Sequence, residues 1–204
     1  MLDSLSHCDG RITPRDVLVA GSFAGPLAFG FALEWGVRGL VAHEAGVGLD
    51  RAGIAGLSLA DRFAVPAAAV ETMSACLGDG PSVYGDGVVA HVNDDAESLG
   101  IAPGMPASVA ARRLLDAPLG RVVPGLTLVD RSHRVVEAAG GRVVLMGSTS
   151  FVTPANVDDV LCVGSHGGRV NAQPLLSCRP RGVIFNDGGR ARDQSGIGAL
   201  AVLD

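Results

Sequence analysis

A glycine-rich segment with a Ser–His pair, GSHGG at residues 164–168, holds the side chains best suited to chemistry. Ser165 supplies a hydroxyl, and His166 supplies an imidazole, which titrates near neutral pH. The apolar stretch VLCV before the segment is typical of a strand buried on both faces, as in a parallel sheet. Because ligands collect at the carboxyl ends of parallel strands, we expect GSHGG to line a site.

Two more polar side chains are expected beside this segment, at the end of the next strand along the chain. The stretch GVIF is followed by Asn186 and Asp187, and a single crossover would place it next to the first strand. We predict Ser165, His166 and Asp187 as catalytic residues, with His166 or Asp187 as the base. Backbone N–H groups of the segment would hold an anion or oxyanion, which gives these predicted ligand-binding residues: Gly164, Gly167, Gly168 and Asn186.

The same arrangement occurs twice, because residues 16–61 align with residues 159–204 without a gap. Fifteen of the 46 aligned pairs are identical, and the shared residues are mostly Gly, Ser and Asp. Each copy contains a strand, a helix and a second strand, which is a βαβ unit with a right-handed crossover.

The two copies differ at the positions that carry chemistry. Phe23 stands where the second copy has His166, and the residues aligned with Asn186 and Asp187 also differ. This difference fits one active and one degenerate site, or a composite site to which both copies contribute. The first copy therefore adds three candidate ligand-binding residues: Ser22, His43 and Glu44.

Most of these residues also have a structural interpretation. Gly and Ser after a strand are what a tight turn requires, and for Ser22 and Ser165 the two interpretations are evenly balanced. Asp50 and Asp193 are each expected to cap a helix by accepting backbone N–H bonds. Adjacent residues rarely aim both side chains at one atom, so Ser165 and His166 cannot form a triad by themselves.

The segment VGSHG resembles the universal stress protein family, in which a similar segment precedes a nucleotide-contacting loop. The resemblance covers residues 160–167, and RVNAQPLLSC stands where the family has a downstream Gly-Ser pair. The GxGxxG fingerprint of dinucleotide-binding proteins is also missing. The resemblance implies nucleotide binding, but these departures leave the chain assigned to neither family.

The surrounding pattern predicts an α/β fold. Residues 62–115 occur only once, so we expect a mostly parallel sheet with helices on both faces, built from two unequal repeated βαβ halves. The halves, residues 1–117 and 118–204, should form one pseudo-symmetric body with a crevice between them. Residues 74–87 are expected to form a loop, and residues 126–130 a strand.

The composition restricts both the chemistry and the partners. The chain has 204 residues and all 16 basic residues are Arg, which excludes Schiff-base and P-loop lysine chemistry. A net charge of −5 without charged runs argues against nucleic-acid or membrane partners. Four cysteines without CxxC spacing and no signal peptide favour the cytoplasm. No zinc pattern or cofactor motif occurs, so neither a metal nor a cofactor is expected.

Three functions stay open. The first is an enzyme, a metal-independent hydrolase or lyase acting on a small carboxylate- or carbonyl-bearing metabolite. The second is a non-catalytic module that binds a small anion or a nucleotide, and the third is a structural assembly protein. The apolar helix expected at residues 26–35 predicts a homo-oligomer under all three.

Overall fold

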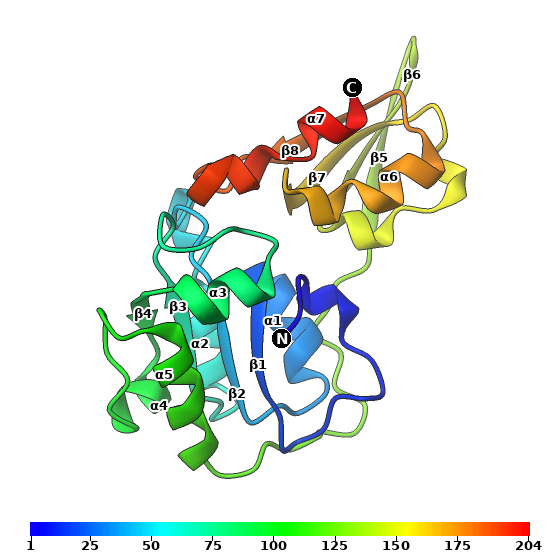
Figure 1. Cartoon of the computed structure of the whole chain (residues 1–204). Coiled ribbons are helices and arrows are strands. Elements are labelled where there is room, and N and C mark those ends of the chain that lie inside the picture. The colour runs from blue at the N-terminus through cyan, green and yellow to red at the C-terminus, as the bar shows by residue number, and fades with distance from the viewer.

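Two four-stranded sheets organise the chain, and the computed structural model describes all 204 residues. The strand orders are β1-β2-β3-β4 and β5-β6-β7-β8. Each sheet is parallel except for one antiparallel pair, β3 with β4 and β5 with β6. Figure 1 shows the sheets in two lobes, the N-terminal lobe below and the C-terminal lobe above. The predicted α/β class with two unequal repeated halves is confirmed.

The first lobe has short buried strands between two layers of helices. The strands are β1 (Val17–Phe23), β2 (Gly39–His43), β3 (Ala67–Val70) and β4 (Val89–Val92). The helices are α1 (Pro26–Leu33), α2 (Gly56–Asp61), α3 (Gly80–Asp86), α4 (Asp94–Ser98) and α5 (Ala107–Arg113). Helices α1 and α2 share one core cluster with the sheet, and α3 and α5 share the other. The predicted loop at residues 74–87 therefore contains a helix, α3.

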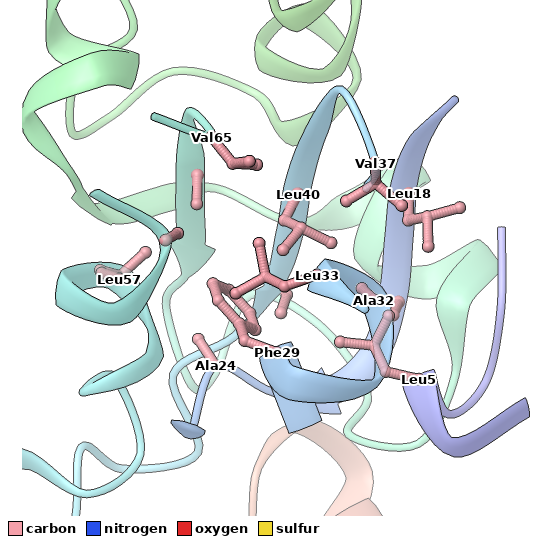
Figure 2. Packing of buried hydrophobic residues seen from close by; sticks show 14 of the residues in the cluster. Leu5, Leu18, Ala24, Phe29, Ala32, Leu33, Val37, Leu40, Leu57 and Val65 are labelled. Carbon is pink, nitrogen blue, oxygen red and sulfur yellow. The ribbon is translucent and has the colours of Figure 1, made fainter. Parts of the chain in front are cut away.

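The apolar helix α1 packs within its own lobe. Phe29, Ala32 and Leu33 are buried against β1 and β2, as Figure 2 shows. Burial of a side chain as large as Phe29 contributes about 1.5–3 kcal/mol. Because this apolar surface is covered by the same chain, the helix gives no reason of its own to expect an oligomer. The homo-oligomer stays a prediction.

The second lobe repeats the first two strands and the crossover. Its strands are β5 (His133–Ala138), β6 (Gly141–Met146), β7 (Val160–His166) and β8 (Gly182–Asn186), and its helices are α6 (Gln173–Cys178) and α7 (Leu200–Leu203). Strand β7 pairs with β8 in the register of β1 with β2, and the register shifts at the matching place before His166 and Phe23. The sequence repeat is therefore a structural repeat. None of the helices is long and apolar enough to cross a bilayer.

The linker between the lobes, which includes residues 126–130, is held by the side chain of Glu34, the C-cap residue of helix α1. Glu34 Oε1 accepts the backbone N–H groups of Leu128 and Val129 at 2.7 and 2.9 Å. Residues 126–130 form no strand, so that prediction was wrong. Their backbone groups bind a carboxylate instead of a neighbouring strand.

The loop after the second strand of each repeat has a left-handed backbone in both copies. Positive φ angles occur at residues 45, 46, 47, 48, 50 and 51, and at the aligned residues 188, 189, 190, 191, 193 and 194. Asp50 has φ 52° and Asp193 has φ 54°, whereas a helix N-cap needs extended backbone. The prediction that these two residues cap helices was wrong. Such conformations cost non-glycine residues about 1–3 kcal/mol each, so this loop is strained in both copies.

Candidate functional site

The two repeats face each other across an approximate two-fold axis. The rings of Phe23 and His166, which are aligned in the repeat, meet edge to face with centroids 6.4 Å apart. Gly46 and Gly189, also aligned, touch so closely that a Cβ atom on Gly46 would lie 3.0 Å from Cα of Gly189. Both contacts pair a residue with its own counterpart, so the axis passes between the partners of each pair.

A cavity of about 480 Å³ opens beside this axis, and both repeats line it. Its apolar wall includes Phe23, Pro26, Leu27, Leu49 and Ala52. Its polar side chains come from the second repeat and the linker: Asp130, Ser132, His166 and Asn186. No arginine lines it, so the cavity offers one carboxylate and no cation.

His166 lines the cavity with a neutral imidazole. Its Nδ1 accepts the backbone N–H of Gly168 at 3.1 Å, so the neutral ring carries its proton on Nε2. The residue is 5% exposed, and Nε2 makes no hydrogen bond within the protein. Burial, and then the nearby His43, lower the pKa of His166 to about 3. The imidazole is therefore uncharged at neutral pH.

Asn186 lies next to His166 on the cavity wall. Its Oδ1 accepts the backbone N–H of Gly188 at 2.8 Å, which leaves the Nδ2 amide group without a protein partner. Gly164 also lines the cavity. The backbone N–H of Gly167 donates to the Asn186 carbonyl oxygen at 2.8 Å, and that of Gly168 is taken by His166. Two of the backbone amides expected to hold an anion are thus bonded internally.

Ser22 and Ser165 each accept a backbone hydrogen bond within their own lobe. The hydroxyl of Ser22 accepts the backbone N–H of Leu5 at 2.8 Å, and that of Ser165 accepts the backbone N–H of Thr149 at 3.1 Å. Each bond ties a 3₁₀ turn, Leu5–His7 or Thr149–Phe151, to the strand end. A second space of about 30 Å³ lies between the two serines, enough for about one or two waters. These contacts are what the structural interpretation of the serines requires.

His43 and Glu44 are buried in the first lobe. His43 Nδ1 accepts the backbone N–H of Ala45, and Nε2 donates to the Ala75 carbonyl oxygen at 3.1 Å. Burial lowers the pKa of His43, so it too is neutral. Glu44 Oε1 accepts two bonds from Thr72, at 2.9 and 2.7 Å, while Oε2 pairs with His91 at 3.2 Å. Through these bonds, both side chains hold loops of the first lobe in place. Neither side chain lines the cavity.

Asp187 does not line the cavity, whereas Asp130, an exposed carboxylate, lies at its edge. The Asp187 side chain is exposed and accepts the backbone N–H of Gly189 at 3.0 Å. Asp130 lines the cavity from the linker, and hydrogen bonds from Ser132 lower its pKa. Sequence reasoning missed Asp130 because the linker has no repeat counterpart and no motif. Asp130 reaches the cavity lined by His166 only because the two lobes pack against each other.

No group of three or more His, Cys, Asp or Glu side chains is arranged to hold a metal ion. Comparison with known family models, with curated proteins and with solved structures found no match to this chain. The geometry of the cavity is therefore the basis on which a function can be assigned.

Proposed function

We propose that this chain is a metal-independent enzyme, a lyase or hydrolase, acting on a small carbonyl-bearing metabolite in the cavity between the repeats. The observation that carries the proposal is His166, a buried, neutral imidazole whose Nε2–H has no partner within the protein. Asp61 Oδ1, and not His166 Nε2, is the enclosed side-chain atom without a partner, so Nε2 keeps contact with solvent and a ligand oxygen can replace water there. The Nδ2 group of Asn186 would supply a second donor.

The chemistry follows from the pKa values on the cavity wall. A pKa of about 3 makes His166 a weak base at neutral pH, but a good neutral donor to a carbonyl oxygen. Asp130 is ionised at neutral pH, and the hydrogen bonds from Ser132 that lower its pKa also make it a weaker base than a free aspartate. A neutral imidazole that polarises a carbonyl, with a carboxylate base, suits proton removal next to that carbonyl. The same carboxylate could instead deprotonate a water that attacks the carbonyl carbon.

The lining favours a carbonyl over a carboxylate ligand. The cavity contains the Asp130 carboxylate and no arginine, so a second negative charge would be repelled. A serine nucleophile is not favoured either, because the Ser165 hydroxyl bonds to Thr149 on the other side of the strand.

The test is a screen of carbonyl compounds by proton NMR in D₂O, which detects both exchange at the neighbouring carbon and product formation. Asp130→Asn should lower the turnover by about 10²–10⁴-fold, and His166→Gln by about 10²–10³-fold. Asp187→Asn and the exposed His133→Gln are the controls and should retain activity. Turnover that depends on Asp187, with Asp130 dispensable, would move the base to the rim of the cavity.

A non-catalytic binding module is the second candidate. It is favoured by the absence of any nucleophile hydrogen-bonded to a base in the cavity. Such a module would be stabilised by its ligand, by about 2.7 kcal/mol at a concentration one hundred times Kd. Stabilisation by a compound that is never turned over would support this candidate against the enzyme.

A further inference from the structure

The two-fold axis relates the cavity to a second position, which the chain itself fills in part, leaving a space of about 830 Å³ open beside its own segment. Its boundary includes Gly21, Gly188 and Ser195, which align with Gly164, Ala45 and Ala52 of the cavity. The occupant is residues 75–79, Ala-Cys-Leu-Gly-Asp, in the loop that leads into α3 at the top of the first lobe (Figure 1).

Three hydrogen bonds and one apolar side chain hold this segment. His43 Nε2 donates to the carbonyl oxygen of its first residue at 3.1 Å, and the backbone N–H of Leu77 donates to Ser195 Oγ at 2.8 Å. The next backbone N–H, that of Gly78, donates to the Gly21 carbonyl oxygen at 2.8 Å. The Leu77 side chain is 3% exposed and packs with Ala45, Ala191 and Phe23.

The groups that hold the segment have counterparts around the cavity. Asn186 aligns with His43 and has its Nδ2 amide free, and Gly164 aligns with Gly21. The groups that pack against the Leu77 side chain also have counterparts in the cavity. Gly48 aligns with Ala191, and the His166 ring aligns with the Phe23 ring.

One counterpart differs in a useful way. Ala52 stands in the cavity where the filled position has Ser195. The cavity therefore lacks one acceptor for a ligand N–H, whereas the other holding groups have a counterpart.

From this correspondence we infer that the cavity takes a peptide-like amide with a leucine-sized aliphatic side chain. A ligand carbonyl oxygen accepts from Asn186 Nδ2, and a ligand N–H donates to the Gly164 carbonyl oxygen. The aliphatic group lies against Gly48 and the His166 ring. His166 Nε2–H remains for a second carbonyl oxygen. The inference rests on the proposed use of this cavity as the ligand site, and it does not require turnover.

The experiment uses the blocked peptide N-acetyl-Ala-Ser-Leu-Gly-Asn-amide, which copies residues 75–79 with Ser in place of Cys and with Asn in place of Asp, so that the peptide carries no negative charge toward Asp130. Binding to the full chain is measured by NMR titration. Replacing Leu by Gly in the peptide should weaken binding by at least about tenfold, because the buried aliphatic contact is lost. Ala52→Ser restores the missing acceptor and should tighten binding about threefold to tenfold.

A matched pair of bulky variants locates the binding. Ala52→Trp fills the cavity from an exposed position and should abolish binding, whereas Ala102→Trp, at an exposed alanine outside the cavity, should not affect it. The inference is overturned if the peptide binds neither the natural chain nor the Ala52→Ser variant. It is equally overturned if Ala52→Trp leaves the affinity unchanged.

The two proposals fail in different ways. Cavity-dependent peptide binding without turnover of any carbonyl compound would keep this inference and remove the enzyme. Turnover of a non-peptide carbonyl compound that depends on His166, with no peptide binding, would keep the enzyme and remove this inference.

Discussion

Phe23 and His166 occupy the same position of the repeat, and their rings pack edge to face across the axis that relates the two copies. Phe23 presents only apolar surface there, whereas His166 adds a ring N–H. A nearly symmetric interface therefore has one polar side, and the imidazole is kept neutral by its burial.

Because His166 is buried, the free energy of unfolding should decrease as the pH is lowered. Its pKa is lowered from 6.5 to about 3, so between these values only the unfolded chain binds the proton. The free energy of unfolding should decrease by about 1.4 kcal/mol per pH unit below about pH 6.5 from this group alone. Above that pH the ring is neutral in both states and adds no pH dependence.

Urea unfolding at several pH values between about 7.5 and 5 measures this slope. The His166→Gln substitution should remove the part of the slope that His166 contributes. The pKa of His43 is lowered too, so the His166→Gln variant retains a slope of the same sign. A variant with the full original slope would show that His166 is not the titrating group.

The buried Glu44 should matter much more for stability than its exposed counterpart Asp187. Glu44→Ala removes the acceptor of two bonds from Thr72 and the partner of His91. Leaving these groups unpaired should cost about 1–3 kcal/mol. Asp187→Ala should change stability by less than about 0.5 kcal/mol. Denaturant midpoints compare the two, and similar losses would contradict the network.

The ion pair of Asp159 with Arg142 should stabilise the second lobe at neutral pH. Both carboxylate oxygens of Asp159, which is 3% exposed, accept from Arg142 at 2.8 and 2.9 Å. Because Arg142 is 44% exposed, solvent screening limits the effect, and Asp159→Asn should cost about 1–2 kcal/mol. The exposed neighbour Asp158 is the control, because Asp158→Asn keeps a residue that tolerates its φ of 66°.

The stability contributed by the Asp159–Arg142 pair should be lost in acid. Hydrogen bonding to Arg142 lowers the pKa of Asp159 below 3.8, so its contribution is present above pH 3.8 and is lost as the pH falls through the lowered value. The difference between the natural chain and Asp159→Asn should therefore shrink in acid. A difference that stays constant down to about pH 2 would contradict this.

Gly188 should tolerate no side chain, unlike Ala45 at the aligned position. Gly188 has φ 60°, and a Cβ atom there would overlap the Leu77 side chain. Gly188→Ala should destabilise the fold by about 1–3 kcal/mol. Ala45 has φ 49°, so Ala45→Gly should change stability by less than about 1 kcal/mol. Equal losses in urea unfolding would contradict the close packing of Leu77.

The repeated core could be predicted from sequence because its signals are local. The apolar runs of β1, β2, β7 and β8 identify strands, and Pro26 marks the start of α1. Helix α3 was missed because its sequence, GPSVYGD, contains two glycines, which hide the cap made by Asp79 with Ser82. Residues 126–130 have a strand-like pattern, but a distant carboxylate binds their backbone.

The site could be predicted only as a region. The strand ends identified His166, Asn186 and Gly164, which line one cavity. Asp130 joins them through the folding of the linker, and no local pattern could show it. The internal bonds of Ser165 also depend on a turn that precedes the repeat. Roles that arise from contacts between the lobes are beyond local sequence patterns.

The segment at residues 75–79 also determines binding stoichiometry. Two repeats related by a two-fold axis would present two equivalent sites, and filling one could then change the affinity of the other. Because the chain places its own segment against the groups that would hold a ligand in one of them, those groups stay free in the other position alone. Ligand should therefore titrate at one molecule per chain with a simple hyperbolic isotherm.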